Sequence, residues 1–567
     1  MSKIKGAKAI VQCLVEEGVD TIFGFPGGVI LDLYDELMDS PIKNLLVRHE
    51  QGAVHAADGY ARASGKVGVA LLTSGPGATN GVTGIATAYM DSIPMVVLTG
   101  QVPRALIGND AFQEVDIVGI TRPCTKHNYL VSNPDDLVPV LREAFYLAAS
   151  GRPGPVLVDM PKDVMASLVA YPEKEEIKMQ TYQPTVEPHP GQVAKACKAM
   201  LKAKRPVLYV GGGVILSNSS KELTELAEKT QIPVTMTLMG LGAFPGTNPL
   251  SMGMLGMHGS YAANMMVAKS DLLIAVGARF DDRITGRLDT FAKEAEIIHI
   301  DIDPTSISKN VKVDIPLVTD CKNALRAINA WFDSSADFDK AAFAEKHKVW
   351  IEQVQEWNAK HPLSYQDEGE IIKPQYVIET INRLTGGDAI ITTEVGQNQM
   401  WTAQFYKFNQ PRQLLTSGGL GTMGYGLPAA IGAKIAFPDK TVIDIAGDGS
   451  IQMNIQELAT AKQYGAAVKV AILNNSYLGM VRQWQELFYD KRYSGTPMEV
   501  TPDFVELAKA YGAVGLRART KSEVEAVIKE ALAINDKVVI MDFVIKREEC
   551  VFPMIPAGRS TTEMLLA

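Results

Sequence analysis

The sequence predicts an α/β protein made of three doubly wound parallel-sheet domains in series. Short apolar runs typical of buried strands alternate with helical patterns along the whole chain, and this alternation favours parallel sheets covered by helices. The length of 567 residues corresponds to about three domains of roughly 100–200 residues each. No sequence repeat relates the first and third segments, so any duplication between them would be structural only.

The first domain is predicted over residues 1–170. Its strand candidates are TIFGF (21–25), KVGVALLTS (66–74), MVVLTG (95–100) and GPVLVDMP (154–161). Residues 171–191 are rich in Pro, Glu and Lys and lack periodicity, which is typical of an interdomain linker.

A second α/β domain is predicted over residues 192–332. Its strand candidates are RPVLYVGGG (205–213), IPVTMT (232–237), LLIAVGARF (272–280) and IIHIDID (297–303). The charged, helix-patterned stretch 333–370 is interpreted as a second connection between domains.

The third domain is predicted over residues 371–550. Its strand candidates are AIITTEVG (389–396), TVIDIAGDG (441–449), VKVAILNN (468–475) and VVIMDFVI (538–545). The tail, residues 551–567, has no clear periodicity, and we expect it to act as a lid or cover.

Composition excludes several classes of protein. The net charge of −9 opposes non-specific nucleic-acid binding, which needs a basic surface. No apolar run reaches the ~18 residues of a membrane span. The five cysteines are far apart and none has CxxC spacing, so neither a disulfide framework nor a zinc site is expected. The first residues resemble an amphipathic helix rather than a targeting peptide, and we expect a cytoplasmic enzyme.

The motif with the clearest chemistry runs from Gly447 to Asn475. Asp448 follows one predicted strand and Asn475 follows the next, so both side chains should meet at the ligand-binding edge of a parallel sheet. A carboxylate, an amide oxygen and a backbone carbonyl suit magnesium, which shares its coordination with phosphate oxygens. Gly447 and Gly449 permit close approach to a pyrophosphate at a helix N-terminus. Either dipeptide alone would be an ordinary turn, but GDG, 24 intervening residues and NN together form the thiamine diphosphate signature.

The first domain should supply the other half of this site. Glu50 follows the predicted strand KNLLVR (43–48). In thiamine enzymes that this chain resembles, such a Glu hydrogen-bonds the pyrimidine ring and promotes proton removal from the thiazolium carbon. A surface glutamate at a strand end would be the alternative. Because different domains bind the two ends of the cofactor, the site should lie at a domain interface. In these relatives the two domains belong to different subunits.

Motifs spread over essentially the whole chain carry a more specific resemblance. They are FGFPGG (23–28), RHEQGA (48–53), TSGPGATN (73–80), DAFQEVD (110–116), GRPGPVLVDMPKD (151–163), MLGMHG (254–259), GARFDDRITGR (277–287), GLGTMGYGLPAAIGAK (419–434) and NNSYLGMVRQWQ (474–485). With these motifs the chain resembles the catalytic subunits of the acetohydroxyacid synthase (acetolactate synthase) family.

The resemblance implies a reaction and partners. Pyruvate is decarboxylated on thiamine diphosphate, and the hydroxyethyl unit is transferred to a second 2-ketoacid. Pyruvate as acceptor gives 2-acetolactate and 2-ketobutyrate gives 2-aceto-2-hydroxybutyrate, precursors of valine, leucine and isoleucine. The resemblance also implies a homodimer or homotetramer with active sites at the subunit interface, and a small regulatory subunit.

The family pattern carries residue roles over to this chain. Arg283 would bind the acceptor carboxylate, since a guanidinium fork matches a carboxylate bidentately, although a surface salt bridge would be its ordinary role. Trp484 would favour the larger acceptor by apolar contact, although it could be a core aromatic. Positions lining the substrate channel would be Phe112, Gln113, Lys162 and Met480.

The resemblance also implies the thiamine diphosphate contacts. Met423 would support the bent shape of the cofactor, and Asn398, where many relatives have His, would still donate to phosphate. The metal ligands of Mg²⁺ would be Asp448, Asn475 and Tyr477. The full set comprises Gly28, Glu50, Pro76, Asn80, Val395, Gln397, Asn398, Gln399, Gly421, Met423, Gly447, Asp448, Gly449, Ser450, Asn475, Tyr477, Leu478, Gly479 and Met480.

A flavin is implied by the central domain. A GGG after a strand is weak evidence, because any tight turn could use it. GARFDDRITG is stronger, because flavin-free catabolic acetolactate synthases lack it. The FAD positions would be Arg152, Gly211, Gly212, Gly213, Met257, His258, Gly277, Ala278, Arg279, Asp281, Asp301, Ile302 and Asp320. The net reaction is not redox, so the flavin is expected to be structural.

Other functions stay open on the sequence. Pyruvate oxidase shares the flavin but uses it as an electron acceptor, and the catabolic synthase lacks it. Benzoylformate and oxalyl-CoA decarboxylases share the thiamine motif. Glyoxylate carboligase lacks the catalytic glutamate, so Glu50 argues against it. A binding module without activity would need a broken catalytic set, whereas Glu50, Asp448 and Asn475 are all present.

Overall fold

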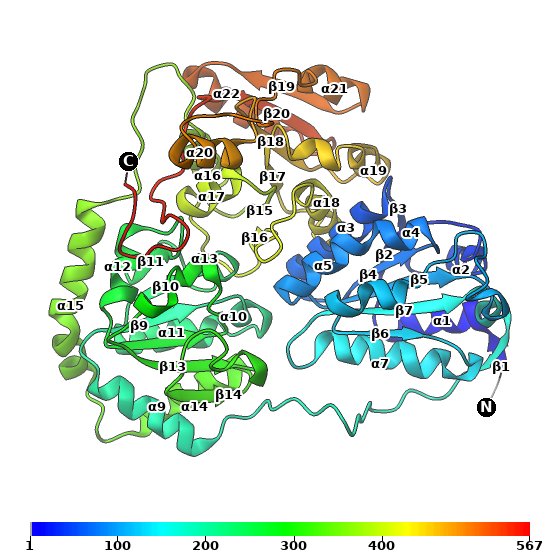
Figure 1. Ribbon diagram of the computed structural model, residues 1–567, viewed down its shortest axis with the longest axis horizontal. Coiled ribbons are helices and arrows are strands. Elements are labelled where there is room, and N and C mark those ends of the chain that lie inside the picture. The colour runs from blue at the N-terminus through cyan, green and yellow to red at the C-terminus, as the bar shows by residue number, and fades with distance from the viewer. Residues whose placement is uncertain (1–2, 567) are drawn as a thin grey trace.

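The computed structural model describes residues 3–566 and contains three six-stranded sheets whose strand pairs are all parallel. Figure 1 shows the first domain in blue to cyan, the second in green, and the third in yellow to red above them. This architecture confirms the predicted α/β fold class. Within residues 3–566, the helices all fall short of the length and apolarity needed to cross a membrane.

The first sheet has the order β3-β2-β4-β5-β7-β6. Its strands are β2 (Thr21–Phe25), β3 (Lys43–Leu46), β4 (Gly68–Leu72), β5 (Met95–Gln101), β6 (His127–Leu130) and β7 (Pro155–Pro161). A small antiparallel pair joins β1 (Lys3–Lys5) to β8 (Leu168–Ala170). The helices are α1 (Gly6–Glu16), α2 (Leu31–Met38), α3 (Glu50–Ser64), α4 (Pro76–Asn80), α5 (Val82–Asp91), α6 (Ile117–Thr121), α7 (Leu137–Ala149) and α8 (Lys162–Ala166).

The central sheet has the order β11-β10-β9-β12-β13-β14. Its strands are β9 (Pro206–Val210), β10 (Val234–Met236), β11 (Ser251–Met254), β12 (Leu272–Val276), β13 (Glu296–Asp301) and β14 (Ile315–Val318). The helices are α9 (Pro190–Lys202), α10 (Gly213–Leu216), α11 (Ser220–Thr230), α12 (Tyr261–Lys269), α13 (Asp282–Thr285), α14 (Cys321–Ser334) and α15 (Lys340–Lys360).

The third sheet has the order β16-β15-β17-β18-β20-β19. Its strands are β15 (Ile390–Thr393), β16 (Leu414–Leu415), β17 (Val442–Gly447), β18 (Lys469–Asn474), β19 (Val514–Ala518) and β20 (Val539–Val544). The helices are α16 (Pro374–Leu384), α17 (Gln397–Phe405), α18 (Gly426–Ala436), α19 (Glu457–Gln463), α20 (Gly479–Phe488), α21 (Phe504–Ala510) and α22 (Lys521–Ala533).

The first and third sheets share one strand order although no sequence repeat relates them. In both, the first strand lies between the second and the third, and the last two strands are exchanged. Each sheet therefore has a point where successive crossovers leave in opposite directions, between β2 and β4, between β9 and β12, and between β15 and β17. Ligands of open α/β sheets bind beside such points, at the carboxyl ends of the strands.

Two helices hold the first and third domains together within one chain. Helix α3 packs against α18, and a Cβ at Gly432 would lie 1.9 Å from the carbonyl oxygen of Ala56. A side chain at this position would separate the helices, so the close crossing requires glycine. Ala56 and Ala429 are also buried, and such small residues let the two helices lie this close.

The segments between domains are packed rather than free. In the predicted linker, the Tyr182 hydroxyl accepts a hydrogen bond from the Lys126 ammonium at 2.8 Å. Helix α15, within the stretch predicted as a connection, buries Trp350 and Val354 in the apolar cluster of the central sheet. The predicted domain boundaries remain predictions.

The tail crosses from the third domain to the central one (Figure 1). Ile555 N–H donates to the Met257 carbonyl at 2.8 Å, and Arg287 N–H donates to the Arg559 carbonyl at 3.0 Å. The tail thus lies against the central domain, held by main-chain hydrogen bonds, and folds back on itself where Met554 pairs with Leu565.

Candidate active site

A pocket lies where the third sheet changes direction, between the carboxyl ends of β15 and β17. Most of the predicted thiamine diphosphate contacts of this domain line it. The lining residues are Val395, Gly396, Gln397, Asn398, Trp401, Met423, Gly447, Asp448, Gly449, Ser450, Leu473, Asn475, Tyr477, Leu478, Gly479, Met480 and Val481. Helices α17 and α20 both begin at this pocket, so their free N–H groups favour an anion there. We call it the β15–β17 pocket.

Asp448 is the only carboxylate that lines the β15–β17 pocket in the described chain. It is 1% exposed, its Oδ1 accepts from Asn475 N–H at 3.4 Å, and its Oδ2 has no hydrogen-bond partner. Burial raises the pKa of Asp448 to about 6. An unpaired buried carboxylate oxygen is costly, so a bound cation would satisfy it.

The donor set fits magnesium shared with a phosphate ligand. Within residues 3–566, no group of three or more His, Cys, Asp or Glu side chains could hold a metal alone. Asp448, Asn475 and Tyr477 all line the β15–β17 pocket. Because magnesium is often bound through one or two carboxylates plus substrate phosphates, these residues fit an ion that arrives with a diphosphate.

The amide side chains after β15 are engaged within the protein. The Asn398 amide donates to the carbonyls of Glu394 and Ile445, at 3.1 and 2.8 Å. Both of its N–H groups thus have protein partners, and donation from this side chain to a phosphate stays a prediction. The backbone N–H groups at the starts of α17 and α20 also face the pocket.

Gln397 and Gln399 are engaged in the same way. The Gln397 amide donates to Gln483 Oε1 and the Glu549 carbonyl, both at 2.9 Å. The Gln399 amide donates to Thr416 Oγ1 at 2.7 Å and to the Ser417 carbonyl at 3.1 Å. These amides hold protein segments, and Gln399 lines a different cavity.

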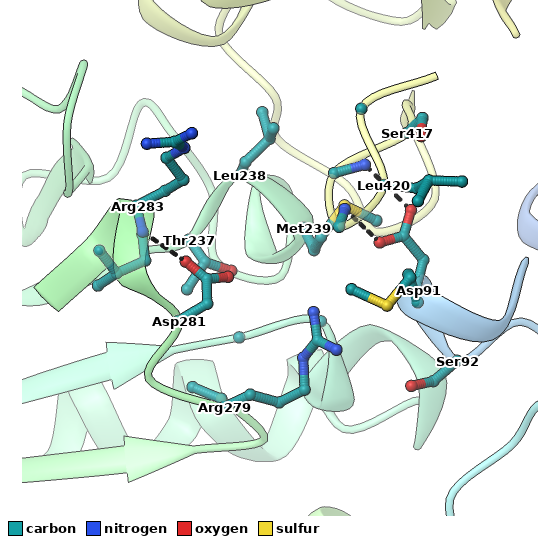
Figure 2. A pocket seen from close by; sticks show the side chains of 18 of the residues that line it. Asp91, Ser92, Thr237, Leu238, Met239, Arg279, Asp281, Arg283, Ser417 and Leu420 are labelled. Carbon is teal, nitrogen blue, oxygen red and sulfur yellow. Dashed lines mark hydrogen bonds between the residues drawn. The ribbon is translucent and has the colours of Figure 1, made fainter. Parts of the chain in front are cut away.

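That cavity, which we call the central cavity, measures about 2180 Å³ and lies at the direction change of the central sheet. It exceeds the roughly 300–1,000 Å³ of ordinary small-molecule pockets. All thirteen predicted FAD positions line it, and Figure 2 shows Arg279, Asp281 and Arg283 on its walls. Its size and position fit a dinucleotide.

The glycines after β9 shape the central cavity by packing against β12. A Cβ at Gly211 would lie 2.1 Å from the Gly277 carbonyl oxygen, so the two turns can approach only without a side chain. Asp320 caps α14 by accepting from Lys322 and Asn323 N–H. Gly211 and Asp320, two of the predicted FAD positions, thus also have a structural role that needs no flavin.

His258 and Arg152, two of the predicted FAD positions, make different kinds of contact at the central cavity. His258 is buried, and its Nδ1 lies 3.4 Å from the Pro553 carbonyl. Burial lowers the pKa of His258 to about 4, so it is neutral near pH 7. The Arg152 guanidinium bridges domains, with Nε donating to Ser92 Oγ at 2.8 Å and an ion pair to Asp303 at 3.0 Å.

The candidate substrate residues Arg283, Met480 and Trp484 also line the central cavity. The Arg283 side chain is 61% exposed, and its only ion pair in the described residues is a 3.7 Å contact with Asp282. Trp484 is half-buried and meets Phe488 edge to face at 5.6 Å. Met480 lines the β15–β17 pocket as well, so the two spaces adjoin at α20.

The first-domain candidates other than Arg152 lie apart from the central cavity and the β15–β17 pocket. Glu50 starts α3, is 9% exposed, and accepts from Asn80 Nδ2 at 2.9 Å. The nearby Thr73 and Ser74 hydroxyls, at the direction change of the first sheet, are buried without partners. A ligand with polar edges would satisfy them.

This group does not reach the pockets of its own chain. Among residues 3–566, neither the β15–β17 pocket nor the central cavity is lined by any member of the group. Phe112 is 87% exposed. The full group is Gly28, Glu50, Pro76, Asn80, Phe112, Gln113 and Lys162.

Sequence reasoning missed several residues of the central cavity. Asp91 and Ser92 at the end of α5, Met239, and the segment from Ser417 to Leu420 all line it. Ser92 has a positive φ of 61°, but no sequence motif signals that residue. The repeated glycines at 418 and 419 were the one available hint.

Comparison with known proteins agrees with this geometry. Family models described as thiamine pyrophosphate enzyme N-terminal TPP binding domain, central domain and C-terminal TPP binding domain match residues 4–120, 193–328 and 394–543. The acetolactate synthase isozyme 3 large subunit of Escherichia coli is 50% identical over 100% of this chain and 99% of its own length. The chain belongs to the acetolactate synthase large-subunit family.

Other members of the acetolactate synthase family are equally similar. The Haemophilus influenzae large subunit is 49% identical over 100% of this chain and 99% of its own length. A Mycobacterium tuberculosis large subunit is 51% identical over 100% of this chain and 92% of its own length. Membership confirms the predicted resemblance. The central-domain match spans all six strands of the central sheet, and the other two matches each cover most of one further sheet.

Proposed function

We propose that the chain is the catalytic subunit of an acetohydroxyacid synthase. It decarboxylates pyruvate and transfers the two-carbon unit to a second 2-ketoacid, in branched-chain amino acid biosynthesis. The observation that best supports this proposal is the position of the β15–β17 pocket. This pocket contains the unpaired Asp448 carboxylate oxygen and adjoins the central cavity, which Arg283 and Trp484 line.

Each end of the site has its own task. Thiamine diphosphate, when bound, supplies the electron sink for decarboxylation. Asp448 and Asn475 would hold its magnesium, and the N-termini of α17 and α20 would bind its phosphates. Glu50 would hold a proton against the pyrimidine ring, in the buried setting that Asn80 completes.

Arg283 and Trp484 would select the acceptor. The exposed guanidinium of Arg283 is free to pair with a carboxylate. The indole of Trp484, at the same cavity, offers apolar area to the extra methyl group of 2-ketobutyrate. The two residues thus act on different parts of one acceptor molecule.

FAD fits the central cavity, and we propose it as a bound group without a redox role in the net reaction. The thirteen positions on the cavity walls support this. Pyruvate oxidase, which passes electrons to its flavin, and the flavin-free catabolic synthase are the alternatives.

We propose that two chains complete each site. The first-domain group that includes Glu50 would face the β15–β17 pocket of a second copy, because it does not line that pocket in its own chain. The exposed Phe112 would then be covered. The relatives' names as large subunits support a small regulatory subunit as a further partner, and a cytoplasmic location remains a prediction.

Product analysis tests the reaction. Purified protein with thiamine diphosphate, Mg²⁺ and FAD receives pyruvate alone or pyruvate with 2-ketobutyrate. We expect 2-acetolactate in the first case and mainly 2-aceto-2-hydroxybutyrate in the second. Acetyl phosphate or acetate with flavin reduction would indicate an oxidase, and acetaldehyde a simple decarboxylase.

Subunit mixing tests the shared site. Glu50→Gln and Asp448→Ala chains should each be nearly inactive alone. Mixed dimers should recover activity, because one of their two sites then combines an intact Glu50 with an intact Asp448. No recovery despite proven subunit exchange would place both residues in a site of one chain.

A further inference from the structure

One segment, Thr416–Met423, forms the wall between the two candidate cofactor spaces, and we call it the dividing loop. Its residues Ser417 to Gly421 line the central cavity, while Met423 lines the β15–β17 pocket. The loop connects β16 to α18 and has no regular secondary structure. Its position must therefore be set by contacts with other parts of the chain.

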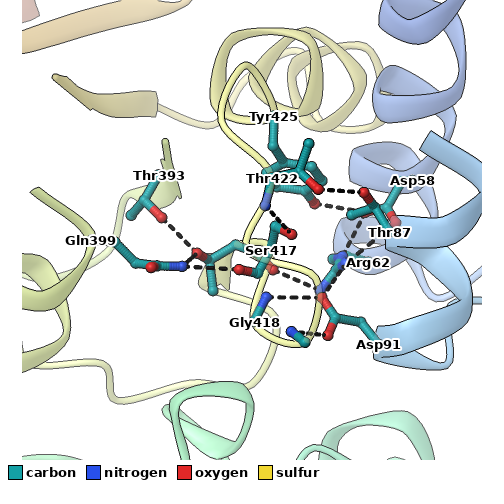
Figure 3. Close-up of polar contacts among 12 residues, drawn as sticks. Asp58, Arg62, Thr87, Asp91, Thr393, Gln399, Ser417, Gly418, Thr422 and Tyr425 are labelled. Carbon is teal, nitrogen blue, oxygen red and sulfur yellow. Dashed lines mark hydrogen bonds and ion pairs between the residues drawn. The ribbon is translucent and has the colours of Figure 1, made fainter. Parts of the chain in front are cut away.

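The first domain holds the dividing loop through one carboxylate. Asp91, the last residue of α5, accepts from Gly419 N–H at 2.7 Å with Oδ1 and from Gly418 N–H at 3.0 Å with Oδ2. Both oxygens of one side chain thus bind two successive backbone groups, as Figure 3 shows. These charge-assisted bonds define both the distance and the orientation of the loop.

Asp91 is itself oriented by Arg62. The guanidinium of Arg62, which is 6% exposed, pairs with Asp91 at 2.9 Å and with Asp58 at 2.5 Å, and donates to the Thr416 carbonyl at 2.9 Å. Both carboxylate side chains are fully buried. Arg62 therefore holds the first residue of the dividing loop directly and its glycines through Asp91.

Further contacts hold the two ends of the dividing loop. The Tyr425 hydroxyl, just after the loop, donates to Asp58 Oδ1 at 2.6 Å. Thr87 and Thr422 share a hydroxyl hydrogen bond of 2.7 Å. On the other side, the Gln399 amide binds Thr416 and Ser417 (Figure 3).

We propose that Asp91, oriented by Arg62, is a positioning residue that holds the dividing loop as the common wall of the flavin and thiamine diphosphate sites. This inference rests on the proposed function. A first-domain residue far from the reacting atoms would then control the affinity for both cofactors. Figure 2 shows Asp91 beside Ser417 and Leu420, on the opposite side of the cavity from Arg283.

The network also explains why its members are charged although they are buried. Two carboxylates and one guanidinium leave one negative charge, which the N–H groups of Gly418 and Gly419 and the Tyr425 hydroxyl face. A buried ion group of this kind is weak evidence for stability but good at specifying one geometry. The geometry specified here is that of the dividing loop.

The test compares three variants of the full-length protein. Asp91→Asn removes the charge with little change of shape. Thr87→Val removes the bond to Thr422, together with the bond from the Thr87 hydroxyl to the Thr83 carbonyl within α5, and guards against a folding defect in the first variant. Glu16→Gln is the matched control, because Glu16 also pairs with a buried arginine of the first domain, Arg142 at 2.9 Å, but contacts neither cavity.

The readouts are the dissociation constants of FAD, by flavin fluorescence, and of thiamine diphosphate with Mg²⁺, by protein fluorescence, each titrated into cofactor-free protein. Circular dichroism checks folding. We expect Asp91→Asn to weaken both cofactors by about tenfold and Thr87→Val by about threefold, as loss of charged and neutral hydrogen bonds respectively implies. Glu16→Gln should stay within about twofold of the unaltered protein.

The inference is overturned if a folded Asp91→Asn protein keeps either dissociation constant within about twofold, or if Glu16→Gln loses as much affinity. If Asp91→Asn does not fold, Thr87→Val decides by the same criterion. If the unaltered protein binds neither FAD nor thiamine diphosphate, the proposed function fails, which differs from failure of the positioning role.

Discussion

Replacing Arg283 by alanine tests how the chain recognises the acceptor 2-ketoacid. The guanidinium stands on the wall of the central cavity with only a 3.7 Å contact to Asp282, so removal breaks no strong pair in the free protein. A charge-assisted hydrogen bond contributes about 1.5–3 kcal/mol. Because the side chain is 61% exposed, solvent screening favours the lower value of about 1.5 kcal/mol.

That value corresponds to a loss of about tenfold in kcat/KM for the acceptor. Arg283→Lys keeps the charge but loses the fork, so we expect it to recover only part of the loss. The assay measures formation of 2-aceto-2-hydroxybutyrate against 2-ketobutyrate concentration at constant pyruvate. Arg287→Ala is the matched control, because Arg287 is 51% exposed, pairs with Asp289, and does not line the cavity.

An unchanged kcat/KM for 2-ketobutyrate in Arg283→Ala would refute this reasoning. So would an equal loss in Arg287→Ala, because the effect would then come from the general positive potential of this surface. A loss confined to pyruvate consumption, with the acceptor dependence unchanged, would move Arg283 to the first half-reaction.

Three further predictions use other residues. Asp448→Ala should weaken Mg²⁺-dependent thiamine diphosphate binding by more than about a hundredfold, since even outer-shell changes cost 10–100-fold; an unchanged Kd would reject the metal assignment. Trp484→Leu should reduce the preference for 2-ketobutyrate over pyruvate by about fivefold, the scale of one methyl contact, and an unchanged product ratio would rule this out. Burial raises the pKa of Asp159 to about 7 from 3.8. The protonated carboxyl therefore supports the folded state fully below about pH 4, and this support is lost as pH rises through 7. The free energy of unfolding should fall by up to about 4 kcal/mol over this range. Asp159→Asn should therefore raise the unfolding free energy relative to the unaltered protein more at pH 8 than at pH 5, and parallel pH profiles would contradict it.

Local patterns in the sequence were sufficient for the fold and for both candidate cofactor spaces. Buried strands such as β9 and β12 are continuous apolar runs, because both faces of a parallel sheet are covered. Asp448 and Asn475 converge because consecutive parallel strands end at one edge. All thirteen predicted FAD positions line one cavity. Twelve of them lie at or after the ends of central-sheet strands, and Arg152 reaches the cavity from the first domain.

The sequence could not show which partner each polar group chooses. Asn398 looked like a phosphate donor, but strands on either side offer carbonyls to its amide. Glu50 does not line the pocket of Asp448 in its own chain, as expected if the two residues meet only between subunits. The bond from Asn398 to the Ile445 carbonyl joins positions 47 residues apart, and residues adjacent in sequence do not predict it.

What the sequence by itself determined is therefore the chemistry available at each strand end, because that depends on residue type and on the period of the strands. What only the tertiary structure decided is the wall between the two cofactor spaces. Asp91 and Gly418 are separated by 327 positions and joined by a 3.0 Å hydrogen bond. Such a contact depends on how α3 and α5 pack against α18 and the loop before it. This packing is set by many side chains that are distant in sequence, so a local sequence pattern cannot predict it.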